Sequence, residues 1–254
     1  MPPQPEFMKK IVFVFWSCLL FSHGFSQDTK SSTTPNTNTK KPALWDRPND
    51  HLLIQLSSDH WNGMTDSIRS HQSGFSKGFN AYFMLDKPFK ATPKYSIGFG
   101  LGVSTSNMEF RRTNIGINAL SATLPFTALD STNHFKRYKL ATTYLELPVE
   151  IRYSMKPSEP NKSWKVALGL KLGTLLNAHT KGKNLVDKNG NVLNSYIEKE
   201  NGKRYINGTR VMSTIRVGYG IFSLFGSYQL TNILKNGTGP AMQLWQAGIT
   251  LSGL

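Results

Sequence analysis

Serine, histidine and aspartate are the residue types of a catalytic triad, and they stand together where Asp59 and His60 lie near several serines. A triad is defined by the geometry of its side chains rather than by sequence position, so these types alone do not predict an enzyme. Four histidines expected in loops are candidate metal ligands: His60, His71, His134 and His179. They lack the tight spacing of a metal site, and solvated loop side chains explain them more simply. We therefore expect neither a catalytic nor a metal site.

Glycines can cradle a phosphate or a cofactor, and a dense group of them is Gly98, Gly100 and Gly102. These three recur at every second position, which indicates close packing on one face of a strand rather than a phosphate-binding loop. We expect no cofactor. The one cysteine, Cys18, lies in a segment that we expect to be removed, so the mature protein is expected to have neither disulfides nor thiol chemistry.

The balance of charge is strongly basic. The sequence contains 30 Lys and Arg residues and 15 Asp and Glu residues, which gives a formal net charge of +15. Such an excess can serve nucleic acid, an anionic membrane surface or solubility. The cations are scattered, and no basic helix or nucleic-acid motif accompanies them, so we expect no binding of nucleic acid. The phosphates of lipopolysaccharide and the periplasmic surroundings are the expected counterparts.

An export signal stands near the beginning of the sequence. Two lysines precede an apolar run over residues 11–21, and Gly24 and Ser26 form a small-x-small cleavage site. This pattern is typical of a signal peptide, predicted over residues 1–26 with cleavage before Gln27. The apolar run is shorter than the roughly twenty residues that a membrane-spanning helix needs.

The export signal divides the chain into three parts. Within the signal peptide, residues 1–7 are expected to be an upstream extension. Residues 27–50 are rich in Thr, Ser, Asn, Lys and Pro, and such a segment buries too little apolar surface to order itself. We predict that it is a disordered periplasmic linker. Residues 51–254 are predicted to form one domain.

Apolar residues recur at every second position from residue 51 onward, which is the signature of strands with one apolar face. Residues 145–153 are the clearest case, because Leu, Leu, Val, Ile and Tyr alternate there with Glu, Pro, Glu and Arg. Eight strands are predicted in all, at residues 52–56, 79–85, 95–103, 145–153, 165–173, 214–220, 222–230 and 245–251.

The face opposite the apolar stripe decides between architectures. In a soluble β-sandwich that face meets water and typically carries Lys, Glu and Thr. Here it carries mainly Gly, Ser and Ala with a few charges of both signs, which suits the cramped interior of a narrow barrel. Because isolated buried charges are costly, these charges are expected to pair. Filling the lumen explains them more simply than a transport role. The expected polar cluster of the lumen comprises Glu146, Glu150, Arg152, Lys171 and Arg216.

The connections between the predicted strands alternate between long and short. The short ones are residues 87–94, residues 156–163 and a tight turn near Gly220, whereas residues 107–139 and 178–208 are the longest. A barrel of the bacterial outer membrane has short periplasmic turns and longer extracellular loops. The sequence therefore predicts an all-β fold, an eight-stranded antiparallel up-and-down transmembrane β-barrel preceded by a signal peptide and a disordered segment. Aromatic residues that could form its interfacial girdles are Tyr82, Phe83, Tyr95, Tyr144, Tyr153, Trp164, Tyr228 and Trp245.

Residues 144–153, with the sequence Tyr-Leu-Glu-Leu-Pro-Val-Glu-Ile-Arg-Tyr, resemble a strand of the PorT-like outer-membrane β-barrel family of Bacteroidetes. Residues 78–89 and the glycine-rich residues 98–102 also look like that family, and Phe-Ser-Gln is a familiar end of a signal peptide in the phylum. The resemblance covers residues 51–254. It implies an outer-membrane barrel, and the family's named member takes part in type IX protein secretion. Leu254 departs from the aromatic residue with which such barrels often end.

These observations together predict a non-enzymatic structural or interaction component of the outer membrane, accessory to protein secretion as the resemblance implies. Its expected partners are outer-membrane lipid, lipopolysaccharide and other envelope or secretion proteins. The interior of an eight-stranded barrel is just wide enough for side chains, so an open pore is not expected. One alternative is transport or binding of a small solute or small apolar ligand through the barrel. Another is a soluble, secreted lipocalin-like binder, which would leave the membrane fraction after a carbonate wash.

Overall fold

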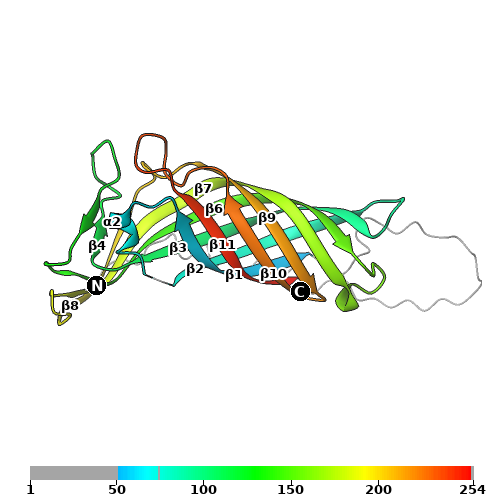
Figure 1. The fold of residues 1–254 in the computed structure, drawn as a ribbon, viewed down its shortest axis with the longest axis horizontal. Coiled ribbons are helices and arrows are strands. Elements are labelled where there is room, and N and C mark those ends of the chain that lie inside the picture. The colour runs from blue at the N-terminus through cyan, green and yellow to red at the C-terminus, as the bar shows by residue number, and fades with distance from the viewer. Residues whose placement is uncertain (1–50, 74, 253–254) are drawn as a thin grey trace, which may run out of the picture. The chain divides into compact units, whose positions relative to one another are not determined.

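The computed structural model describes residues 51–73 and 75–252, and this part of the chain is dominated by long strands (Figure 1). The predicted signal peptide and linker, residues 1–26 and 27–50, lie outside the described residues. The described residues include two short helical turns, α2 (Asp66–Arg69) and a 3-10 turn at Pro160–Lys162. No helix in the described part is long and apolar enough to cross a bilayer.

Eight antiparallel strands form a closed ring. Along the ring the order is β6-β3-β2-β1-β11-β10-β9-β7, and β6 pairs again with β7 to complete the circle. All eight strands predicted from the alternating pattern are present, most of them longer than predicted, and the antiparallel all-β class is confirmed. Their bounds are β1 (Leu52–Asn62), β2 (Ser76–Pro88), β3 (Tyr95–Phe110), β6 (His134–Ser154), β7 (Trp164–Val186), β9 (Thr209–Tyr219), β10 (Phe222–Gln229) and β11 (Gln243–Ser252).

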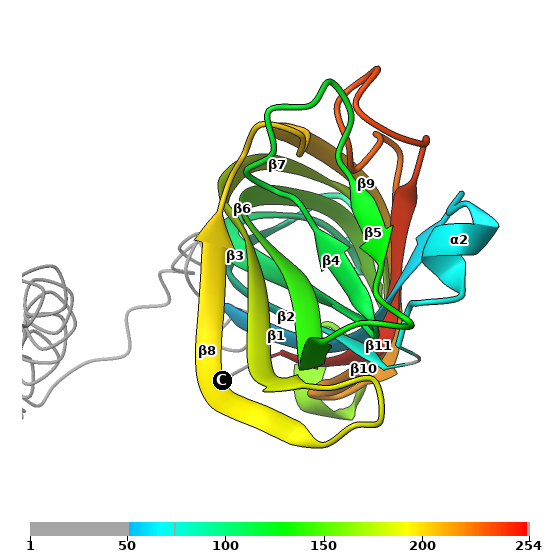
Figure 2. The same ribbon diagram turned by 90° about the vertical axis from the view of Figure 1, so that its left-hand side faces the viewer.

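Long and short connections alternate around the ring, as predicted. The connections of residues 89–94, 155–163 and 220–221 lie at one end, which also holds the last residues of β11. We call this the short-turn end. The connections at the opposite end, the long-loop end, are much larger, and Figure 2 looks onto them.

The two longest predicted loops are in large part strands, which corrects the prediction for residues 107–139 and 178–208. β3, β6 and β7 continue well beyond the predicted runs at the long-loop end. Three further strands lie outside the ring: β4 (Thr113–Ile115), β5 (Phe126–Ala128) and β8 (Val192–Asn201). β4 pairs with β5, and β8 adds to the extended part of β7.

The two faces of the ring differ in polarity in the way that the alternation predicts. Outward-facing Leu147, Val149 and Leu170 are 52%, 49% and 50% exposed, whereas inward-facing Glu146 and Lys171 are 0% and 1% exposed. The apolar stripes therefore point away from the interior, and together they form a continuous apolar belt. An apolar surface of that extent marks contact with lipid or with another protein.

Small residues allow the narrow interior to hold large polar side chains. Gly98 on β3 faces the Arg152 side chain, and a Cβ atom at Gly98 would overlap the guanidinium group. A Cβ atom at Gly102 would likewise overlap the ring of Tyr82. The glycine face of β3 therefore provides the space in which an arginine and a tyrosine of neighbouring strands lie, which agrees with the packing role that the sequence indicates for these glycines.

Aromatic residues border the apolar belt at both of its edges. At the short-turn end, Tyr95 packs against Tyr153 with ring centroids 5.1 Å apart, and Trp164 packs against Tyr219 at 5.7 Å. At the other edge, Trp245 stacks on His60 at 4.4 Å. The girdle prediction is wrong for two residues, Tyr82 and Tyr144. Both are only 2% exposed and point into the ring, because each falls on the polar side of its strand.

Candidate functional site

The interior of the ring contains all five residues of the predicted lumen cluster, in two groups. The first group lies towards the short-turn end. There the Glu150 carboxylate accepts hydrogen bonds from Arg152 Nε at 3.0 Å and Arg216 Nη2 at 2.9 Å. Arg152 Nη1 also lies 3.6 Å from an Asp86 oxygen. Because the three charges of the Glu150 group are buried, their mutual pairing offsets the cost of removing them from water.

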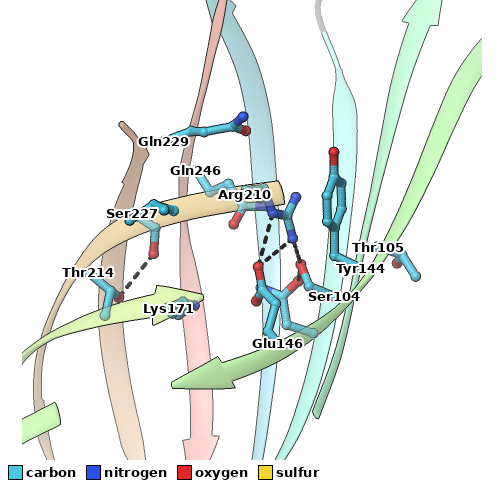
Figure 3. Close-up of polar contacts among 12 residues, drawn as sticks. Ser104, Thr105, Tyr144, Glu146, Lys171, Arg210, Thr214, Ser227, Gln229 and Gln246 are labelled. Carbon is cyan, nitrogen blue, oxygen red and sulfur yellow. Dashed lines mark hydrogen bonds and ion pairs between the residues drawn. The ribbon is translucent and has the colours of Figure 1, made fainter. Parts of the chain in front are cut away.

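The second group surrounds Glu146 at the middle of the ring (Figure 3). Arg210 donates to Glu146 Oε1 from Nε at 3.0 Å and from Nη2, and Tyr82 donates its hydroxyl hydrogen to the other carboxylate oxygen at 2.5 Å. Arg210 also donates to Ser104 Oγ at 2.7 Å and lies over the Tyr144 ring, 3.9 Å from its centroid. One carboxylate thus receives a two-pronged ion pair and a phenol, the kind of charge-assisted bonding that is strongest in proteins.

Lys171 joins this group to the strands across the ring. Its Nζ donates to Gln55 Oε1 at 2.9 Å and lies over the rings of Tyr82 and Phe225, 4.9 and 5.5 Å from their centroids. Gln55 in turn donates to Thr250 Oγ1 at 3.1 Å. The network therefore runs from β7 to β1 and β11, and it crosses the interior rather than lining its wall.

The sequence pattern did not predict Arg210, which is more buried than Arg152 and Arg216. It is 1% exposed and lies six residues before Arg216 on β9. The alternation Arg210, Met212, Thr214, Arg216 would have placed it on the inward face, but the predicted strand began at residue 214. Extending the period-two pattern backwards by two steps would have found it.

An apolar cluster lies beyond the polar network at the long-loop end. We call this cluster the apolar cap. It combines inward-facing residues from the ends of the ring strands with residues of the long loops, so it fills the mouth of the ring. Its buried members are Trp61, Met64, Ile68, Met108, Phe110, Ile115, Ile117, Leu124, Tyr138, Leu140, Ala178, Tyr205, Ile206, Met212, Ile233, Leu234, Met242 and Leu244.

Tyr205 shows how the cap is fastened to the loops. Its side chain is fully buried, and its hydroxyl lies 2.5 Å from the carbonyl oxygen of Ala119 and 2.9 Å from that of Ser121. The backbone of Leu124 in the same loop donates to the Thr238 carbonyl at 2.8 Å. The loop between β4 and β5 is thereby tied to the segments before β9 and β11.

Asp59 and His60, the triad residue types that stand together in the sequence, do not come together in the structure. Asp59 faces the interior, where it accepts hydrogen bonds from Ser57 and Gln246, whereas His60 faces outward against Trp245. Consecutive residues of a strand point to opposite faces, so these two side chains cannot meet. The described residues contain no group of three His, Cys, Asp or Glu side chains placed to hold a metal ion.

His71 lies between two loops at the long-loop end. One ring nitrogen lies 2.8 Å from the Ser67 carbonyl oxygen, and the other lies 3.1 Å from an Asp130 oxygen. These two acceptors raise the pKa of His71, the Ser67 carbonyl having the larger effect. The contact ties the loop between β1 and β2 to the loop between β5 and β6.

A membrane-spanning ring with a filled polar interior and an apolar outer belt defines the class of outer-membrane β-barrels. In agreement, residues 52–235 match the family of the outer membrane protein beta-barrel domain, and the chain belongs to that family. Membership indicates a location in the outer membrane. No curated protein matches the chain. Barrels of this class usually place their short turns in the periplasm, so we expect the short-turn end to be periplasmic and the long-loop end to be extracellular.

Proposed function

We propose that the protein is a non-enzymatic, non-conducting barrel of the PorT-like type that acts as a structural or interaction component of the outer membrane. The observation that carries this proposal is the filled interior. Ion-paired side chains cross the ring around Glu150 and Glu146, and the apolar cap closes the extracellular mouth above them. Both layers occupy the space that is a water-filled lumen in a conducting barrel.

Conductance across planar bilayers separates this proposal from the alternative of transport. The purified protein, reconstituted next to a porin as a positive control, is expected to add no steady current steps over a range of voltages. The reason is that ions would have to displace a paired carboxylate and then cross an apolar cluster. Steady single-channel currents at the native sequence would overturn the non-conducting proposal and favour transport of small solutes.

The part of the molecule beyond the apolar belt at the long-loop end supports the interaction part of the proposal. We call it the extracellular extension; it comprises the outer ends of β3, β6 and β7 together with β4, β5 and β8. In the described part of the chain β8 pairs with β7 alone, so its other edge offers free backbone groups. Apolar side chains on β8 are also exposed, with Val192 at 54%, Leu193 at 52% and Ile197 at 56%. A strand edge of this kind can accept an extended segment of another protein. The resemblance to the PorT-like family makes an envelope protein of the secretion machinery the expected partner.

Site-specific photo-crosslinking in intact cells tests this part. A photo-reactive residue at Ile197 on β8 is expected to give a discrete adduct with one envelope protein. The same residue at Lys90, an exposed position in a periplasmic turn, is the matched control and is expected to give no such adduct. An absent adduct at Ile197, or the same adduct from both positions, would contradict the assignment of β8 as the interaction surface.

A further inference from the structure

Three lysines lie side by side on the outer surface of the extracellular extension. Lys139 on β6 is the register partner of Lys181 on β7, and Lys181 is the register partner of Lys199 on β8. We call these three residues the basic row. They face outward, because their neighbours along the strands, such as Leu140 on β6 and Thr180 on β7, are buried in the interior.

The positive charges of the basic row repel one another. Side chains directly opposite each other on neighbouring strands are about 5 Å apart at Cβ, and like charges at that separation destabilise a sheet. A second cross-strand pair of cations, Arg137 and Lys183, lies one step farther from the membrane. The register places a single carboxylate, Glu109, at the β3 end of the row next to Lys139. The cations therefore far exceed the negative charge that faces them.

The positive charge of the row affects the pKa of the groups beside it. Burial and the charge of Lys181 lower the pKa of Lys139. Partial burial and the charges of the three lysines together lower the pKa of His179. On β7, His179 lies two residues before Lys181, on the same face and nearer the membrane. Lys139 Nζ is fixed in place, because it donates to Asn107 Oδ1 at 2.6 Å. One ammonium group of the row is thus positioned by a neutral side chain, which does not cancel its charge.

A surface cavity of about 180 Å³ adjoins the row, lined by Glu109, Arg137, Tyr138, Lys139, Lys181 and Lys183. A cavity of this size holds several water molecules, so it has room for a small anionic group. The cavity and the row share one outward surface, which continues on β7 from the last exposed apolar residue of the belt, Leu176. The lysines therefore lie just beyond the apolar belt, on its long-loop side.

We propose that the basic row and its cavity bind the phosphate groups of an anionic lipid of the outer leaflet. Phosphate oxygens match a set of ammonium groups that outnumbers the one carboxylate beside it, and each contact would relieve repulsion between neighbouring lysines. The surface lies on the outside of the extension, beside the hydrocarbon belt, so a lipid can reach it with its chains still in the membrane. This inference depends on the outer-membrane location and not on the non-conducting role.

The test compares the native protein with a variant in which Lys139, Lys181 and Lys199 are all changed to Gln. Binding of lipid A to the detergent-solubilised full chain is measured by native mass spectrometry. Each lysine near an anionic lipid contributes about fivefold, so the variant is expected to bind on the order of a hundredfold more weakly. The matched control removes the same charge at the other end of the barrel, with Lys87, Lys90 and Lys94 changed to Gln, and is expected to bind like the native chain.

Two further arms identify the ligand group and its source. Dephosphorylated lipid A is expected to bind weakly to the native chain, and inorganic phosphate alone is expected not to displace lipid A at equal concentration. Equal binding by the basic-row variant and the native chain, equal binding of the dephosphorylated lipid, or displacement by inorganic phosphate would each overturn the proposal. All six changed lysines are outside the core, so heat-modifiable migration on gels is expected to report folded barrels throughout.

Discussion

Replacing Glu146 by alanine is expected to lower the free energy of unfolding by about 3–5 kcal/mol, the cost of leaving a buried charge without its partner. The Arg210 guanidinium would lose both of its bonds to the carboxylate, and the Tyr82 hydroxyl would lose its acceptor. Arg210 is 1% exposed, so water cannot replace these bonds. Urea unfolding of the protein in lipid vesicles, followed by tryptophan fluorescence, measures the change.

The double variant Glu146→Leu, Arg210→Met distinguishes an unpaired charge from a general loss of packing. Replacing both partners of a buried ion pair by apolar residues is often neutral or stabilising, so the double variant is expected to recover most of the lost stability. Glu198→Ala on β8, an exposed carboxylate, serves as the control and is expected to change little. The explanation fails when Glu146→Ala unfolds like the native chain or the double variant is no more stable than the single one.

The ring could be predicted because its strands obey one simple rule over a long stretch. On β3, β6 and β7 the residues that face lipid are apolar at every second position, and the residues between them are small or charged. Both the existence of the strands and the direction of each face follow from that alternation. The long and short connections follow from the turn residues between the strands.

The extracellular extension could not be predicted in the same way, because the apolar stripe changes sides within single strands. On β6, Leu145 and Leu147 face outward, whereas Tyr138 and Leu140 face inward into the apolar cap. The register between β6 and β7 shifts at Thr143 and Tyr144, where this change occurs. Above the membrane the outside is water, so apolar residues move to the inside. A search for one continuous apolar face ends at that point.

The candidate site was predicted only in part for a related reason. Glu146, Glu150, Arg152, Lys171 and Arg216 stand out because each lies between two apolar residues in a clear alternation. Arg210 is the second residue of its strand and directly follows Asn207, Gly208 and Thr209, so no apolar alternation leads up to it. Tyr82 resembles an interfacial aromatic by its residue type. Which cation pairs with which carboxylate depends on the stagger between strands, and the sequence does not contain that information in a local pattern.

The orientation of the apolar belt leads to the second large expected effect. Changing Leu170 to Arg is expected to destabilise the folded barrel in lipid by about 2–4 kcal/mol, because the new charge would lie near the middle of the hydrocarbon. Leu170 pairs with Val149, which in turn pairs with Phe99, and all three are exposed on the centre of the belt. Unfolding in lipid vesicles measures the loss.

Leu193 on β8 provides a matched control, because its exposure of 52% is nearly that of Leu170 at 50%. Leu193→Arg is expected to change stability by less than about 0.5 kcal/mol, since that side chain meets water above the membrane. The difference between two equally exposed leucines then isolates the hydrocarbon as the cause. A soluble sheet protein would tolerate both changes alike, so equal stability of the two variants would contradict the transmembrane orientation of β7.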